Sequence, residues 1–306
     1  MISNLTPSAE TFLANMARVQ RSVEQASRQV SSGKRVTEAS DAPDEVAGIL
    51  QLRADQTRNT QIQSNLALAR TDADAADSAL AAAAKLMDRA RTLGAQGANF
   101  TLDATGRQSI ADEIQSIQDQ MLSVSQTTVQ GRYIFSGDQD GGPAYQADAT
   151  SPTGVARLNF SLGTRRVEDP AGGSFAVSKS ASEIFDAQND DGTPSASNVF
   201  AALNNLRLAL TANNTDQINA AVGALQTAAD HLNTAEAFYG SVQTSIQDAM
   251  NYGSSYDLQL KTELSQKEDA DVTAAAMVLN QGTIQLQAAF QMQAKMPRTS
   301  LFDYIG

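Results

Sequence analysis

The fold is decided near the N-terminus by residues 2–30, which read ISNLTPSAETFLANMARVQRSVEQASRQV. Apolar side chains recur there in alternating steps of three and four residues: Ile2, Leu5, Ala9, Phe12, Met16, Val19, Val23, Ala26 and Val30. This heptad spacing predicts a long amphipathic helix whose narrow apolar stripe faces another helix, as in a coiled coil. Thr6-Pro7, with Glu10 in the first turn, is typical of a helix start.

The heptad pattern stops at a short polar segment that contains a glycine. We interpret residues 31–42 as a hinge with Gly33 at its centre, because Ser-Ser-Gly-Lys-Arg breaks the apolar spacing. Asp41 is predicted to cap a second helix that carries Pro43 and two acidic residues in its first turn. That helix has an apolar seam of small residues, formed by Ile62, Leu66, Ala69, Ala73, Ala76, Leu80, Ala83, Met87 and Ala90.

The middle of the chain has a different pattern. A third helix is predicted from the spacing of Ile110, Ile114, Ile117, Met121 and Val124. After it, residues 133–135 are β-prone, residues 156–162 alternate between apolar and polar, and Phe175 with Val177 suggests another strand. Residues 131–194 are therefore expected to form a small β-rich insertion.

Helical spacing returns after the insertion, in residues 199–210, 218–232 and 272–289. We therefore predict a mainly α fold, a long coiled-coil-like bundle formed by the N- and C-terminal segments with a small β-rich domain inserted in the middle. The predicted parts are terminal coiled-coil helices (1–42 and 253–306), a helical rod (43–130 and 195–252) and the β-rich domain (131–194). We also expect the helical part to fold without residues 138–194.

Composition excludes several classes of partner. The formal net charge of -12 argues against nucleic acid, which is bound through an extensive surplus of Lys and Arg. The sequence has no cysteine, so it offers neither a disulfide nor a thiolate metal site. It begins without the basic and apolar regions of a cleaved signal peptide, and no apolar run is long enough to cross a membrane.

No group of residues predicts catalysis or a cofactor, and we expect that the chain is not an enzyme. His231 is the single histidine, so a catalytic triad or a multi-histidine metal site lacks its parts. Gly33-Lys34 lacks the earlier glycine and the preceding strand of a phosphate-binding loop.

Two acidic runs have simpler interpretations than metal binding. Asp186, Gln188 and Asp190 have the spacing of a calcium-binding loop. However, Asp191 and Ser197 stand where that loop needs glycine and glutamate, so a solvated loop is expected. The second run, formed by Asp72, Asp74 and Asp77, is expected to solubilise an exposed helix face.

Three segments resemble the flagellin superfamily. One is the N-terminal heptad helix, and the next is VSSGKRVTEASDAPDEVAGILQLRADQTRN, where that superfamily has a Ser-Ser-Gly hinge before a helix. GRYIFSG, formed by Gly131, Arg132, Tyr133, Ile134, Phe135, Ser136 and Gly137, is similar to the hook-filament junction proteins (hook-associated protein 3, FlgL type). The ending TSLFDYIG points to the same group.

The resemblance implies a structural subunit of the bacterial flagellum that forms a junction ring and supports flagellin polymerisation. The implied partners are copies of itself, the other hook-associated junction protein, flagellin and a cytosolic export chaperone. The implied location is the flagellum, reached by secretion without a cleaved signal peptide. Two alternatives stay open, namely flagellin itself and a coiled-coil adaptor of a secretion system.

The terminal heptads are the predicted assembly surface. The residues expected in it are Leu5, Phe12, Met16, Val19, Val23 and Val30 near the N-terminus, and Leu279, Leu286 and Phe290 near the C-terminus. We expect the two terminal helices to lie antiparallel. We also expect residues 1–40 and 255–306 to become ordered only on assembly, because their apolar faces lack enough cover within one chain.

Overall fold

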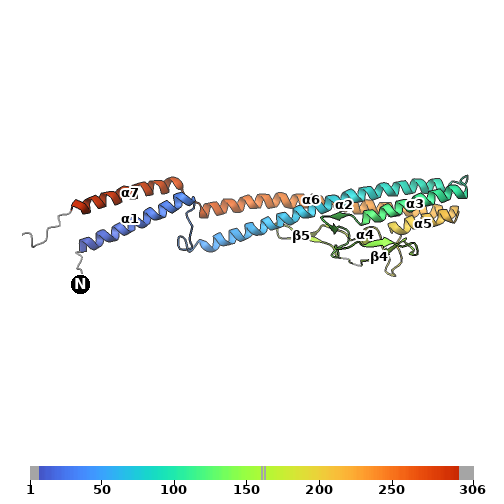
Figure 1. The fold of residues 1–306 in the computed structure, drawn as a ribbon, viewed down its shortest axis with the longest axis horizontal. Coiled ribbons are helices and arrows are strands. Elements are labelled where there is room, and N and C mark those ends of the chain that lie inside the picture. Colours follow the sequence, from blue (N-terminus) through green and yellow to red (C-terminus); the bar gives the residue numbers. More distant parts are fainter. Residues whose placement is uncertain (1–6, 160, 162, 296–306) are drawn as a thin grey trace, which may run out of the picture. The chain divides into compact units, whose positions relative to one another are not determined.

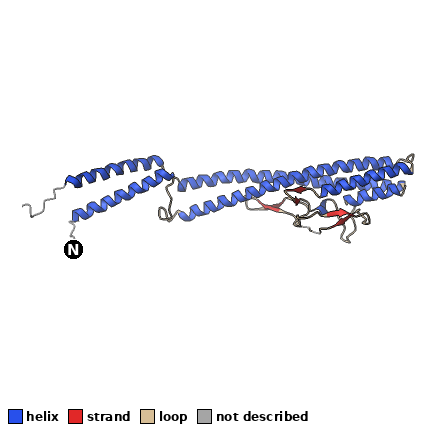
Figure 2. Ribbon diagram, in the orientation of Figure 1, coloured by secondary structure: helices blue, strands red, loops and turns tan. Residues whose placement is uncertain are grey.

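The structure, a computed structural model, describes residues 7–159, 161 and 163–295. Helices dominate this part of the chain, and all the strands fall between Thr128 and Ala176, as Figures 1 and 2 show. The predicted fold class, mainly helical with a small β-rich part in the middle, is therefore confirmed. The chain divides into two compact units: the terminal unit (Met1–Arg58 with Asp257–Gly306) and the central unit (Asn59–Tyr256).

The terminal unit is built on a helical hairpin. Helix α1 (Pro7–Ser32) packs along helix α7 (Val272–Lys295), and Figure 1 shows them side by side. Residues 22–26 of α1 lie beside residues 270–278, whereas residues 18–19 lie beside residues 278–285, so the two helices are antiparallel as predicted.

The central unit contains most of α2 (Val46–Gly97) and α6 (Thr215–Glu268), with α3 (Ala104–Ser125) and α5 (Val199–Thr211). The small-residue seam predicted for α2 is buried along its whole length, from Ile62 to Ala90. Asp103 and Asn198 begin α3 and α5 by accepting a hydrogen bond from a backbone N–H of the first turn.

The β-rich segment consists of three separate two-stranded antiparallel sheets. Their strands are β1 (Thr128–Val129) with β2 (Arg132–Tyr133), β3 (Tyr145–Ala147) with β4 (Val155–Arg157), and β5 (Arg166–Glu168) with β6 (Ser174–Ala176). A single turn of helix, α4 (Ala181–Ile184), follows. The predicted strands at 133–135 and 156–162 are too long, since β2 ends at Tyr133 and β4 ends at Arg157.

The β-rich segment and the helices of the central unit share one hydrophobic core. Phe135 packs edge-on against Phe185 and Tyr239, with ring centroids 5.5 and 6.4 Å apart. Tyr145 of β3 packs edge-on against Phe200 of α5 at 5.2 Å. These rings join the insertion to α5 and α6, the helices that follow it in sequence. The division into three domains remains a prediction.

The predicted start of the second helix at Asp41 is wrong. Helix α2 begins at Val46, and residues 33–45, which we call the hinge loop, are not helical. The Asp41 carboxylate instead accepts hydrogen bonds from the backbone N–H groups of Thr37 and Glu38. An aspartate near a turn can satisfy backbone donors on its N-terminal side, and this arrangement competes with a helix cap.

Candidate assembly surface and hinge

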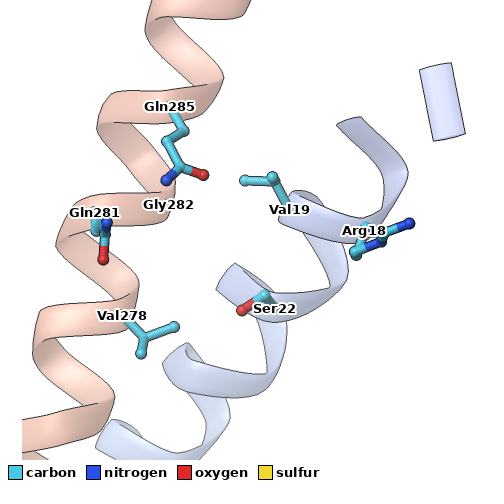
Figure 3. Close-up of a pocket in the computed structure, with 7 residues that line it drawn as sticks. All are labelled: Arg18, Val19, Ser22, Val278, Gln281, Gly282 and Gln285. Carbon is cyan, nitrogen blue, oxygen red and sulfur yellow. The ribbon is translucent and has the colours of Figure 1, made fainter. Parts of the chain in front are cut away.

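The α1–α7 hairpin is held by small side chains along one seam. Ala26 and Ala275 are buried there, and Val19 and Val23 approach Gly282 of α7. A Cβ atom at Gly282 would lie 2.4 Å from a methyl carbon of Val23, so this crossing requires glycine. Figure 3 shows Val19 pointing toward Gly282, while Arg18 points away from α7.

The structure describes every predicted assembly residue except Leu5, which lies outside the described residues. Those that are half-buried are Phe12, Met16, Val19, Val23, Val30, Leu279 and Leu286. Phe290 is 60% exposed and projects from the hairpin. The hairpin therefore covers only part of the apolar surface that the heptads present, and whether the rest contacts other subunits remains a prediction.

Helix α7 also carries a second apolar face that the sequence analysis missed. Met277, Ile284 and Met292 are each about 60% exposed. Helix periodicity places Met277 and Ile284 on the side of α7 opposite the seam residues Ala275 and Gly282, and Met292 on a flank of it. No charged residue occurs in α7 before Lys295. Large apolar side chains exposed together on one helix face mark an interaction surface, so this face of α7 is suited to further packing.

Gly33 ends α1 in the left-handed conformation, with φ +70°. Its N–H donates to the Gln29 carbonyl, and its own carbonyl accepts from the N–H of Ala270 at 2.9 Å. A glycine at this position is the common end of an α-helix, because other L-residues are strained at positive φ. The predicted hinge glycine thus ends one terminal helix and touches the start of the other.

A buried carboxylate organises the hinge loop, and it too was missed. Glu268, the last residue of α6, is 2% exposed and forms ion pairs with Lys34 and Arg53. The Glu268 carbonyl accepts hydrogen bonds from the N–H groups of Arg35 and Val36. No spacing rule predicts this group, since its partners are more than two hundred positions away in the sequence.

The GRYIFSG segment turns the chain from α3 into the β-rich part. Gln130 and Gly131 both have positive φ, the geometry of a tight two-residue hairpin turn, and they connect β1 to β2. Ile134, Phe135 and Ser136 are buried. Gly137 has φ +64°, and a Cβ atom there would lie 2.7 Å from the Gly163 carbonyl oxygen. The segment therefore has a structural role in the central unit.

Arg132 of the same segment connects the insertion to α2. Its guanidinium pairs with Asp72 at 3.2 Å and Asp140 at 3.3 Å, and Arg165 pairs with Asp72 at 2.8 Å. The expectation that Asp72 merely solubilises an exposed face is therefore wrong. It fails because two arginines from a distant part of the sequence fold over this carboxylate.

The residues considered for other chemistry have structural partners. The Asp186 carboxylate is held by Arg157 and by the side-chain N–H of Asn198, so it does not form a calcium loop. A ring nitrogen of His231 lies 2.7 Å from the Glu183 carbonyl oxygen. Within the described residues there is no group of acidic or histidine side chains that could hold a metal ion.

Comparison with known proteins gives a consistent result. Residues 2–140 match the family model of the bacterial flagellin N-terminal helical region. Flagellar hook-associated protein 3 of Escherichia coli (strain K12) is 25% identical over 296 residues, covering 90% of each chain. A flagellin of Bacillus subtilis (strain 168) is 24% identical over 278 residues, covering 87% of this chain and 86% of that protein.

Solved structures share the fold. The flagellar hook-associated protein-3 of Legionella pneumophila superposes with a TM-score of 0.61 at 13% identity, over 71% of this chain and 98% of that one. In the part of the chain that the structure describes, no helix is long and apolar enough to cross a membrane.

Proposed function

We propose that this chain, a homologue of flagellar hook-associated protein 3 within the flagellin superfamily, is a structural subunit of the bacterial flagellum. Its place is the junction between the hook side and the filament, where it supports flagellin polymerisation. The observation that carries the assembly role is the uncharged helix α7, which is packed on one face and apolar and exposed on the other.

The physical reason is that the terminal hairpin cannot bury its own apolar surface. Its fully buried seam consists of small residues such as Ala26 and Ala275, whereas the larger Met277, Ile284 and Phe290 remain exposed. Apolar area removed from water contributes about 25 cal/mol per Å². Neighbouring subunits supply that cover in a ring or helical assembly, which repeats one interface with a rotation and a rise.

The finer parts of the proposal concern partners and export. The proposed neighbours are copies of this chain, the other hook-associated junction protein and flagellin. A cytosolic chaperone is proposed to cover the α7 face before export. Export through the flagellar apparatus would need no cleaved signal peptide. This role involves no catalysis, in keeping with relatives that are structural flagellar proteins.

Flagellin is the second candidate, because a flagellin matches over nearly the same length at nearly the same identity. The structured GRYIFSG segment favours the junction protein. Abundance separates the two, since flagellin dominates sheared filaments and a junction protein is a minor band. A coiled-coil adaptor of a secretion system would share the terminal hairpin alone.

The test uses a strain that lacks the gene, complemented with variants. Wild type should restore filaments, whereas deletion alone should leave hooks without filaments and release flagellin into the medium. Changing both Met277 and Ile284 to Gln should abolish filaments while leaving the central unit folded, because both side chains lie on the exposed face. Leu208→Gln, at a 49% exposed position in α5, is the control. Normal filaments on the deletion strain would exclude the proposed function.

A further inference from the structure

Glu268 occupies a position that is unfavourable for a carboxylate without charged partners, for two independent reasons. It is 2% exposed, and burying a charge is costly unless the charge is paired. It is also the last residue of the 54-residue helix α6, where the helix dipole disfavours a negative charge. A residue that conflicts with its local setting is often kept for a structural or functional purpose.

The charged groups around Glu268 come from three segments of the terminal unit. Lys34 belongs to the hinge loop, Arg53 lies in the first turns of α2 with its guanidinium 2.6 Å from the Glu268 carboxylate, and Lys267 precedes Glu268 in α6. Arg35 adds a second connection, since its guanidinium donates to the Lys267 carbonyl and pairs with Glu45 at 2.7 Å. Both the hinge loop and α2 are thereby fixed to the end of α6.

Main-chain hydrogen bonds fix how the end of α1 is oriented relative to the end of α6. The N–H of Arg35 donates to the Glu268 carbonyl at 2.6 Å, and the N–H of Ala270 donates to the Gly33 carbonyl at 2.9 Å. These bonds place the end of α1 beside the three residues that separate α6 from α7. The carboxylate, its two cations and this short bridge therefore define where the hairpin begins.

We propose that Glu268 is a positioning residue for assembly: it locks the hinge loop to the junction of α6 and α7 and so sets the direction in which the α1–α7 hairpin leaves that junction. We call the ion pairs of Glu268 with Lys34 and Arg53, together with the main-chain bonds beside them, the lock. The effect on assembly rests on the proposed function, but the lock itself is a property of the single chain. Subunits of a ring must all present their hairpins in one direction, so a loosened hinge should reduce assembly.

Trypsin gives a direct readout, because the lock contains its own cleavage sites after Lys34 and Arg35. In the purified full-length chain these bonds should be cut slowly, since both residues are paired and their backbone is bridged to residues 268–270. Glu268→Gln keeps the shape and removes the charge. We expect cleavage at both sites to accelerate at least tenfold, with cleavage after Arg91 in α2 unchanged.

Three further variants separate a specific lock from general damage. Glu263→Gln removes the same charge from α6 at a residue whose carboxylate accepts from Gln259, and it should leave cleavage unchanged. Glu268→Asp keeps the charge and should restore part of the protection. By itself, Arg53→Gln should accelerate cleavage after Lys34 and Arg35. Combined with Glu268→Gln it should add little, because both substitutions remove the same ion pair.

Two outcomes would overturn the proposal. Unchanged cleavage in Glu268→Gln would show that there is no lock, whatever the protein does in the cell. Faster cleavage combined with a full number of filaments in the complemented strain would show that the lock does not position the hairpin for assembly. Failure of the wild-type gene to restore filaments counts against the proposed function alone, since the trypsin experiment uses only the isolated chain.

Discussion

At the scale of single residues, Phe135 and Phe100 are two phenylalanines in opposite settings. Phe135 is fully buried among Phe185 and Tyr239, whereas Phe100, in the turn after α2, is 90% exposed. We expect Phe135→Ala to lower the free energy of unfolding by about 3–5 kcal/mol, through lost burial and the cavity left behind. Phe100→Ala should change it by less than about 0.5 kcal/mol. Urea unfolding measures both, and equal effects would contradict the structural role of GRYIFSG.

Gly33 allows a test of backbone conformation without side-chain contacts. A Cβ atom there would meet nothing within 4 Å, so any effect of Gly33→Ala comes from the positive φ and should be about 1–2 kcal/mol, confined to the end of α1. Gly33→Asn should cost less, because asparagine tolerates this conformation. Gly33→Pro should cost most, since proline cannot reach φ +70° and loses the N–H that donates to Gln29. Hydrogen exchange in residues 27–35 gives the order, and equal exchange in all three would contradict it.

The sequence could predict a residue's role where that role depends on its neighbours in the chain. Gly33 was recognisable because a glycine follows a heptad seam. Glu268 and Asp72 were not, because each is paired with cations that folding brings from elsewhere in the sequence, such as Arg53 at 2.6 Å from Glu268 and Arg165 at 2.8 Å from Asp72. A charged residue type does not indicate which distant side chain will pair with it, so Asp72 was interpreted as solvated and Glu268 was not singled out at all.

At the scale of elements, long periodic helices were predictable and short strands were not. The α2 seam repeats over many turns, so a few exceptions do not hide it. Each strand here has two or three residues, too few to show an alternation. The start of α2 was misplaced because Asp41 has stronger local partners in Thr37 and Glu38 than a helix cap would provide.

The β-rich segment gives the next prediction, which reverses our expectation from the sequence. Deleting residues 138–194 would remove Tyr145, Val155, Ile184 and Phe185 from the shared core. Phe200 would lose its ring partners Tyr145 and Phe185, and Phe135 would lose Phe185. We therefore expect the deletion to abolish cooperative melting of the helices, followed by circular dichroism. Removing only residues 171–173, the exposed part of the β5–β6 turn, and closing it with Asn-Gly is the control and should melt as wild type. A cooperative transition in the large deletion would restore the original expectation.

At the scale of the whole molecule, apolar burial is distributed unevenly between the two units. The large hydrophobic core lies entirely in the central unit, whereas the hinge cluster of the terminal unit comprises only Val36, Ala42 and Ile49, with Leu264 against it. Segments with few buried contacts open more readily. In dilute monomer we expect amides of residues 10–30 to exchange at least a hundredfold faster than those of residues 62–90. Assembly should slow them, and equally slow exchange in the monomer would show that the hairpin is already stable.

Acid should destabilise the terminal unit before the central unit. The reason is that two carboxylates of the terminal unit have lowered pKa values. Burial by itself raises the pKa of Glu268, but hydrogen bonds and charge from Lys34 and Arg53 outweigh it, so the pKa lies below the ordinary value of 4.5. Hydrogen bonds from Glu38 and Thr37 lower the pKa of Asp41 below 3.8. A group whose pKa is lower in the folded state stabilises it fully above the unfolded value, and this contribution disappears as the pH falls through the folded value.

Protection of the hinge loop should therefore be constant from pH 7 to about pH 5 and fall at lower pH. In the central unit Asp148 and Asp191 also have lowered pKa values, through Thr150 and Thr193, but both lie in exposed turns outside the apolar core. Hydrogen exchange, corrected for the intrinsic rate at each pH, should show residues 33–45 losing protection before residues 62–90. Glu268→Gln should remove most of this pH dependence, because its amide cannot titrate. If both regions lost protection together in the wild type, the carboxylates of the hinge would not control the stability of the terminal unit.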